Sequence, residues 1–237
     1  MAHFRAVPVA LVCGLILALG GCATGGSEPA PASTPRPVPA PTTPAHDEAA
    51  PSSPEPTPDK TTPRTRTASL SIPSIGLKDL SVVPYKGTTD DWPGTRIQNR
   101  GAAASPYGDQ GGVGPGEIGN YLITAHRLSA GGPLRDLPSV AKGDSVLVRS
   151  SGVVHEYVII ESRRTSFRSE RSLAEQRAAV PGFPGKHPTK AMITISTCAT
   201  PEDNAAGNFW RDDRGNPEHR IDKIGVLRKS VSPSPTP

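Results

Sequence analysis

Cysteine is scarce in this sequence, whose 237 residues include only Cys13, Cys22 and Cys198. The first two lie within or at the end of an N-terminal apolar segment, so Cys198 has no partner for a disulfide. A leftover thiol is either a reactive group or, like most free cysteines, a small buried apolar residue. No regular spacing of cysteine, histidine and carboxylate residues indicates a metal site. We therefore predict no metal and no cofactor.

The sequence also lacks a strong charge of one sign. Its formal net charge is +4 at pH 7, and lysine and arginine are scattered along the chain. They are neither grouped into long runs nor interleaved with aromatic residues, which make up only 4% of the chain. Because nucleic-acid-binding surfaces concentrate basic residues, we predict no nucleic-acid partner.

No apolar run is long enough to cross a membrane comfortably, since a spanning helix needs about 20 apolar residues. The run after Arg5 has about 14 residues, which is typical of a signal peptide. It ends in LGGC (residues 19–22), which resembles a bacterial lipobox, where the cysteine becomes the acylated first residue. We therefore predict a lipoprotein signal peptide over residues 1–21 and a lipid anchor on Cys22, at the outer face of the cell membrane. An ordinary signal peptide or an uncleaved anchor is the alternative.

Proline is concentrated where bulky apolar residues are rare. Twelve of the 28 prolines lie between Pro29 and Pro63, and such a segment cannot bury enough apolar surface to offset the entropy lost on ordering. We predict a disordered Pro-rich linker over residues 22–66, a folded domain over residues 67–229 and a disordered tail over residues 230–237. The folded part is long enough for one hydrophobic core.

The folded part alternates short β-rich segments with turn-rich loops. Strands are predicted over residues 70–77, 80–85, 121–126, 145–150, 153–162, 191–198 and 221–229. Residues 86–119 are rich in glycine and have little periodicity, which indicates a loop. Helix signals are weak, with a turn at Pro133–Leu137 and a short helix over Ser172–Ala179 capped by Ser172. This pattern predicts a mostly β fold, either a closed barrel or a sandwich.

Three residues suited to acyl transfer lie at the ends of predicted strands: His126, Cys198 and Arg220. A thiolate is the nucleophilic form of cysteine, and an imidazole can accept its proton and later protonate a leaving amine. A guanidinium stays charged and can stabilise an oxyanion. Side chains at one rim of a barrel can converge although they are distant in sequence. The spacing alone is a weak signal, because the chain has five other histidines.

Several segments together resemble the sortase family of cysteine transpeptidases. PGEIGNYLITAHR (residues 115–127) is similar to the family strand that ends in Ala/Gly-His-Arg, and ITISTCATP (residues 193–201) is similar to its Leu-Thr-Leu-Thr-Thr-Cys segment. HRIDKIGVL (residues 219–227) resembles the Arg-led final strand. Residues 72–77 and 131–148 are similar to the opening strand and to the segment with a short helix followed by a strand. These matches occur in the same order as in the family. The segment TAHR (residues 124–127) is most similar to the class E sortases of actinobacteria.

The resemblance implies an eight-stranded β-barrel with one or two short helices. It implies that Cys198 attacks the Thr–Gly bond of a Leu-Ala/Pro-X-Thr-Gly sorting motif near the C-terminus of another secreted protein. An amine of a cell-wall precursor or a pilin lysine then resolves the thioacyl enzyme. His126 would transfer protons and Arg220 would stabilise the oxyanion, while Thr197 and Arg127 are expected to bind substrate.

The sequence also departs from the family. The connection between Cys198 and Arg220 is usually short, whereas here it is the 21-residue segment Ala199–His219. Phe209 and Trp210 in this segment are expected to pack it against the barrel rather than to form a lid. A lipobox anchor is atypical of the family. Substrate recognition is expected in residues 163–190, by analogy with the family loop in that place.

Two other functions stay open. One is a cysteine hydrolase or an L,D-transpeptidase-like wall enzyme, although the Ser-His/Arg-Gly-Cys motif of that wall family is absent and papain-like enzymes place the cysteine before the histidine. The other is a surface lipoprotein that kept the barrel, lost catalysis and acts as a binding module. Retention of the cysteine, the histidine and the arginine counts against the second alternative.

Overall fold

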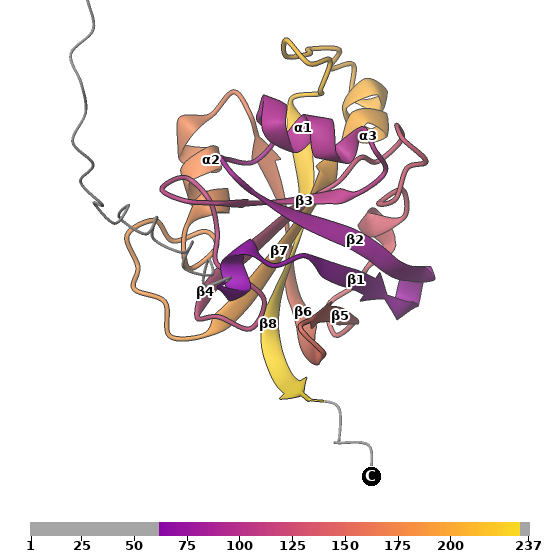
Figure 1. The fold of residues 1–237 in the computed structure, drawn as a ribbon. Helices are drawn as coiled ribbons and strands as arrows, with labels where there is room; N and C mark the ends of the chain where they lie inside the picture. Colours follow the sequence, from indigo (N-terminus) through magenta and orange to yellow (C-terminus); the bar gives the residue numbers. More distant parts are fainter. Residues whose placement is uncertain (1–61, 233–237) are drawn as a thin grey trace, which may run out of the picture. The chain divides into compact units, whose positions relative to one another are not determined.

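The computed structural model describes residues 62–232 of the chain. Eight strands of this part close into a barrel in the order β1-β2-β3-β4-β7-β8-β6-β5 (Figure 1). The strands are β1 (Ala68–Ile72), β2 (Leu77–Lys86), β3 (Ala103–Tyr107), β4 (Gly119–Thr124), β5 (Ser145–Ser150), β6 (Val153–Ser166), β7 (Ala191–Cys198) and β8 (His219–Val231). Neighbouring strands are antiparallel, except that β2 pairs with β3 and β4 pairs with β7 in parallel. The predicted mostly β barrel is confirmed.

Short helices occupy the connections between strands. The α-helices are α1 (Trp92–Gln98), α2 (Glu170–Arg177) and α3 (Thr200–Ala205), and the 3-10 turns are η1 (Pro63–Thr65), η2 (Pro73–Ile75) and η3 (Leu137–Ser139). Figure 1 shows α1 and α3 at the same end of the barrel. Among the residues described, no helix has the length and apolar character that a membrane span requires.

The barrel interior is an apolar core, and β7 shows how the sequence builds it. Ile193 and Ile195 point into the barrel and are fully buried, as strand alternation predicts. The residues that alternate with them on the other face, Thr194 and Ser196, are also only 1% and 2% exposed. Strand β7 is therefore covered on both faces, inside by the core and outside by the connection that contains α2.

A layer of polar side chains joins α2 to the outer face of the barrel. The Gln176 side-chain amide donates hydrogen bonds to Asp222 at 3.1 Å and to Ser196 at 3.3 Å. Thr165 donates to the other carboxylate oxygen of Asp222 at 2.6 Å, and Asn120 donates to the Gln176 carbonyl at 3.0 Å. Burial raises the pKa of Asp222. Because these groups satisfy one another, the β6–β7 connection is held against β4, β7 and β8.

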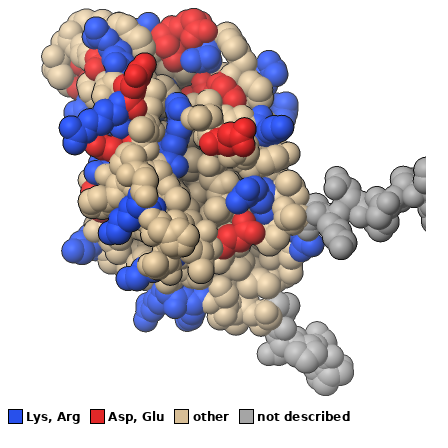
Figure 2. All heavy atoms as spheres, turned by 90° about the vertical axis from the view of Figure 1, so that its left-hand side faces the viewer, with Lys and Arg blue, Asp and Glu red and all other residues tan. Residues whose placement is uncertain are grey.

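Figure 2 shows one face of the surface, on which lysine and arginine are interspersed with aspartate and glutamate. No single-sign patch dominates this face. The arrangement agrees with the scattered charges of the sequence.

Some predicted elements need correction. The predicted loop over residues 86–119 contains both α1 and β3. Helix α2 begins two residues earlier than expected, because Ser169 rather than Ser172 caps it by accepting a hydrogen bond from the Ser172 amide at 3.2 Å. The Ser172 hydroxyl instead accepts a hydrogen bond from the Ser166 amide.

The limits of the folded part also differ slightly from the prediction. Turn η1 precedes the expected start at residue 67, and β8 continues to Val231, past the expected end at residue 229. The predicted signal peptide and the lipid-anchor residue Cys22 lie outside the described residues.

Candidate active site

Three adjacent strands bring Cys198, His126 and Arg220 to one end of the barrel. Cys198 is the last residue of β7 and lies directly opposite Arg220 of β8. On the other side of β7, Ser196 is paired with Thr124 of β4 in parallel register. His126 follows Thr124 by two residues, just as Cys198 follows Ser196. His126 and Cys198 therefore lie at the same height along the two strands. The register therefore gathers the three residues that the sequence analysis selected.

A cavity of about 310 Å³ opens beside Cys198 and His126. Helix α1 supplies one wall through Trp92, Thr95 and Asn99, and residues 214–217 of the connection before β8 supply another. The remaining lining residues follow the ends of β4 and β7: Arg127, Leu128, Ser129 and Thr200. The thiol and the imidazole thus face a space that a substrate can enter.

The imidazole of His126 is oriented by α1. Its Nε2 atom lies 2.7 Å from Asn99 Oδ1. Because an amide oxygen only accepts hydrogen bonds, Nε2 carries the proton in this contact and Nδ1 of the neutral ring is unprotonated. Burial lowers the pKa of His126, and the charge of Arg220 lowers it further while Asp90 opposes the change. The neutral form of the imidazole is therefore favoured relative to a histidine in water.

The thiol of Cys198 is protonated in the resting structure. Burial raises the pKa of Cys198 to about 11, although the positive charge of Arg220 works against this rise. The Sγ atom donates a weak hydrogen bond to Asn216 Oδ1 at 3.8 Å. Both the raised pKa of the thiol and the lowered pKa of the imidazole favour the neutral forms of Cys198 and His126.

Arg220 is buried, with 1% exposure, and held on several sides. Its Nε donates to Asp90 at 2.7 Å, its Nη1 donates to the Pro217 carbonyl at 2.6 Å, and its guanidinium carbon lies 3.8 Å from the centre of the Phe167 ring. Its Nη2 is buried and has no hydrogen-bond partner among the described residues. A buried donor without a partner is costly; Arg220 lies opposite Cys198 in the sheet but does not line the cavity.

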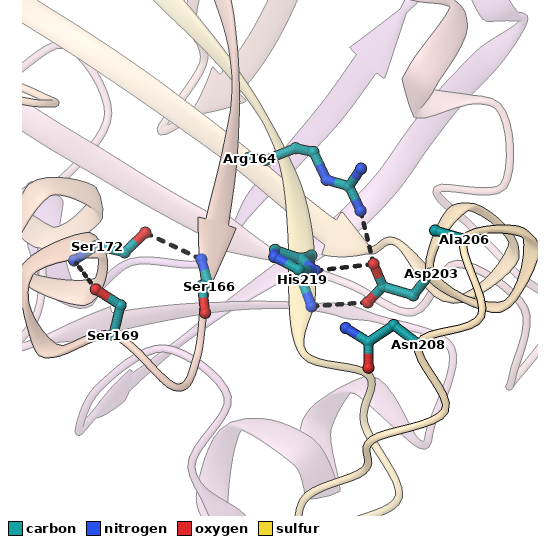
Figure 3. Close-up of a pocket in the computed structure, with 8 residues that line it drawn as sticks. All are labelled: Arg164, Ser166, Ser169, Ser172, Asp203, Ala206, Asn208 and His219. Atoms are coloured by element: carbon teal, nitrogen blue, oxygen red, sulfur yellow. Dashed lines mark hydrogen bonds and ion pairs between the residues drawn. The ribbon is translucent and has the colours of Figure 1, made fainter.

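A second cavity, of about 430 Å³, lies beside the start of β8 (Figure 3). Its lining includes the buried Asp203 of α3, whose carboxylate accepts hydrogen bonds from Arg164 at 2.6 Å and from the ring and the backbone amide of His219 at 2.8 and 2.9 Å. Helix α3 begins two residues after Cys198, and His219 directly precedes Arg220. Asp203 therefore fixes the two strand ends that carry the nucleophile and the guanidinium.

The two residues expected to bind substrate, Thr197 and Arg127, both have structural contacts. Thr197 is 2% exposed, does not line the cavity, and donates a hydrogen bond to the Ala125 carbonyl at 2.8 Å. Arg127 lines the cavity, but its guanidinium contacts both carboxylate oxygens of Glu202 at 3.0 and 3.1 Å. In this structure, both residues position the ends of β4 and β7 relative to each other.

The connection before β8 is partly exposed rather than packed throughout. Phe209 is 70% exposed, contrary to the expectation that it would pack against the barrel. Trp210 lies near the Arg168 guanidinium, at 5.8 Å from the ring centre to the guanidinium carbon. Further along, Asp212 accepts hydrogen bonds from the backbone amides of Arg214 and Asn216. This turn holds the cavity wall in place.

Sequence reasoning missed Asp90, Asn99 and Asn216, which contact the three selected residues. A local signal was present for α1: Asp91 caps the helix by accepting from the Gly94 amide, and Pro93 stands in the first turn. This start signal would have placed Asn99 near the end of a short helix, but not beside His126. No sequence pattern marks Asp90 or Asn216, whose contacts depend on the closed barrel.

Comparisons with known proteins agree with this geometry. The Sortase domain family matches residues 70–209, more than half of the chain. The solved structure of SrtA sortase from Actinomyces oris is similar with a TM-score of 0.53 and 17% identity, covering 70% of this chain and 81% of that one. Sortase E from Streptomyces avermitilis and sortase E1 from Streptomyces coelicolor each give a TM-score of 0.50, with 19% and 21% identity, covering 71% of this chain and 91% of theirs. At these identities they establish the fold, and no curated protein matches in sequence.

The raised pKa of Cys198 predicts how its reactivity depends on pH. Since only the thiolate is alkylated, the rate of Cys198 modification by iodoacetamide should increase about tenfold per pH unit from pH 7 to beyond pH 9. Mass spectrometry of the peptide that contains Cys198 measures this rate separately from the other cysteines. Arg220→Gln should shift the profile to higher pH, because it removes a charge that lowers the pKa. A wild-type plateau below pH 9 would contradict the prediction.

Proposed function

Because this chain belongs to the sortase family, we propose that it is a cysteine transpeptidase that cleaves a Leu-Ala/Pro-X-Thr-Gly-like sorting motif between Thr and Gly and transfers the acyl half to an amine. The observation that supports this most directly is the convergence of Cys198, His126 and the unpartnered Nη2 of Arg220 at one rim. The family match ends at residue 209, so the role of Arg220 rests on its register opposite Cys198.

The geometry supports a two-step reaction. In the first step, Nδ1 of His126 takes the thiol proton, and Cys198 Sγ attacks the threonine carbonyl carbon while Nη2 of Arg220 donates to the developing oxyanion. The C–N bond then breaks, and the imidazolium gives its proton to the leaving glycine amine. In the second step, an incoming amine attacks the thioester, the S–C bond breaks, and the proton from the amine returns through His126 to the thiol.

The proposed partners are secreted proteins that carry the sorting motif and an acceptor amine of a cell-wall precursor or a pilin lysine. The support is the family membership and the open cavity beside Cys198. The alternatives are a cysteine hydrolase, in which water takes the place of the amine, and a binding module without catalysis.

A peptide assay separates these functions. Incubation of the full chain with Leu-Ala-X-Thr-Gly or Leu-Pro-X-Thr-Gly peptides should add the mass of the acyl half to Cys198, and an added amine should yield a new amide product. Cys198→Ala should abolish both signals while the circular dichroism spectrum stays unchanged. Hydrolysis without any amide product supports the hydrolase, and an unmodified Cys198 that still reacts with iodoacetamide supports the binding module.

Loss of the buried guanidinium should slow turnover, measured on Arg220→Ala protein that circular dichroism shows to be folded, because the variant leaves Asp90 without its partner. Arg220→Ala removes the Nη2 donor, and loss of one oxyanion donor lowers kcat by roughly 10²–10³-fold in other acyl-transfer enzymes. Steady-state kinetics with a motif peptide measures this effect, and Arg149→Ala on the exposed side of β5 is the matched control. A decrease of less than threefold would show that another group stabilises the oxyanion.

We also propose that the protein is a lipoprotein at the outer face of the cell membrane, anchored through Cys22. The support is the apolar run and the LGGC segment (residues 19–22). Two or three acyl chains give stable anchoring, whereas one chain does not. A clickable palmitate analogue should label the wild-type protein in its host, and Cys22→Ala should lose the label. Equal labelling of both proteins would exclude this anchor.

A further inference from the structure

A small cavity of about 100 Å³ lies at the start of β4, away from the proposed acyl-transfer site. Asn120, the second residue of β4, lines it, and about 20 Å of extended chain separates Asn120 from His126. In Figure 1 the turn η1, in indigo where the described chain begins, lies far from α1 and α3. The cavity is therefore separate from the one beside Cys198, and the proposed reaction makes no use of it.

Two arginines from different elements line this cavity, and none of its lining residues is a carboxylate. Arg64 belongs to η1, and Arg177 is the last residue of α2. Within the described part of the chain, neither guanidinium lies within the 4.0 Å of a carboxylate oxygen that defines an ion pair. Because like charges repel in a small space, this pair of cations favours an anion between them.

The guanidinium of Arg177 is half-buried and has few partners. Its Nη1 donates to Gln110 at 3.3 Å, and its Nε is buried without a partner among the described residues. Its Nη2 makes no hydrogen bond there either, but it is not buried, so this end of the group can reach a ligand. Burial lowers the pKa of Arg177, and the Tyr85 phenol opposes this change.

The carboxylates nearest to this region do not balance Arg177. Asp109 and Glu170 line a larger neighbouring cavity of about 550 Å³, to which Arg177 also contributes, but neither forms an ion pair with it. A partly desolvated cation without a counter-charge is costly. An anion bound beside Nη2 would therefore stabilise the arrangement that the structure shows.

A glycine-rich loop forms the third wall and holds Arg64 in place. A Cβ atom on Gly112 would lie 2.3 Å from the Asn120 carbonyl oxygen, and one on Gly114 would lie 2.4 Å from the Arg64 amide nitrogen. Side chains are thus excluded where the loop approaches β4 and η1 most closely. This close approach keeps Arg64 beside the cavity and leaves the loop wall as bare backbone at three lining residues, Gly108, Gly111 and Gly112.

We propose that Arg64 and Arg177 bind a phosphate group in this cavity. Guanidinium groups match phosphate oxygens with paired N–H donors. A phosphate monoester carries a charge of about −1.5 to −2 at pH 7 and three acceptor oxygens, so it can balance both arginines at once. A carboxylate has one charge and matches a single guanidinium. The cavity holds roughly three water molecules, so it admits the phosphate group and leaves the rest of the ligand outside.

The test follows the amide NMR signals of Gly108, Gly111 and Gly112 while the full chain is titrated with sodium phosphate at constant ionic strength. The chain carries Cys22→Ala, so no lipid is attached at that residue. The signals should saturate, and Arg177→Gln should raise the Kd at least about tenfold, as expected for the loss of a charged hydrogen bond. Arg64→Gln, which changes an exposed residue, should weaken binding in the same direction.

The matched control is Arg149→Gln, an exposed arginine on β5 outside the cavity, which should bind phosphate with an unchanged Kd. A titration without saturation overturns the proposal, as does an equal Kd in Arg64→Gln and the control. Acetate that binds as tightly as phosphate would also overturn it, because the cavity would then select any anion.

A lipid headgroup or a soluble ester can carry the phosphate group, and two probes distinguish these sources. One is glycerol 3-phosphate in solution, and the other is phosphatidylglycerol vesicles, to which binding is measured by sedimentation. If Arg64→Gln and Arg177→Gln release the chain from vesicles, the group is carried by a lipid. If they weaken only the binding of glycerol 3-phosphate, it is soluble, and if they weaken neither, the proposal is wrong. Cys198 takes no part in these measurements, so their outcome is independent of the proposed transpeptidation.

Discussion

The buried ion pair between Arg220 and Asp90 is the constraint on which the site depends. A guanidinium with 1% exposure is tolerated only if its charge is balanced, and removing one partner of such a pair typically destabilises a protein by about 3–5 kcal/mol. Asp90 directly precedes Asp91, the cap of α1. The charge requirement at β8 therefore fixes where α1 begins, and α1 in turn supplies Asn99 to His126 and Trp92 to the cavity wall.

The polar layer outside the barrel also holds β8 in place, through hydrogen bonds rather than an ion pair. Gln176, Asp222 and Thr165 form hydrogen bonds between α2, β8 and β6. Burial raises the pKa of Asp222, and the Thr165 hydroxyl and the Gln176 amide donate to its carboxylate oxygens. The chain thus keeps the only buried guanidinium of its described part oriented toward the end of β7.

The sequence predicted strand bounds most accurately where residues that face the core alternate with residues that face away from it. Strands β5 and β7 have the predicted bounds, because their alternating or β-branched residues meet a core on one side. The glycine-rich region before β4 was predicted to be a loop, so α1 and β3 were missed. Asp91 and Pro93 nevertheless marked the start of a helix. Cys198, His126 and Arg220 could be selected from chemistry and resemblance, whereas Asp90, Asn99 and Asn216 could not. Their partners are distant in sequence, and only the closed barrel decides which polar groups meet.

The connection between Cys198 and Arg220 leaves the sheet and returns to it at neighbouring positions. The Ala199 amide donates to the His219 carbonyl at 2.9 Å, so the first and last residues of the excursion are joined by a backbone hydrogen bond. Between them, Asp203, Asn216 and Pro217 contact the strand ends, whereas the stretch around the exposed Phe209 can change in length while the nucleophile and the guanidinium keep their spacing. The entropic cost of closing a loop grows only slowly with its length. Such changes in length therefore destabilise the fold little. Evolution can therefore alter which molecules reach the thiol independently of the bond-making chemistry.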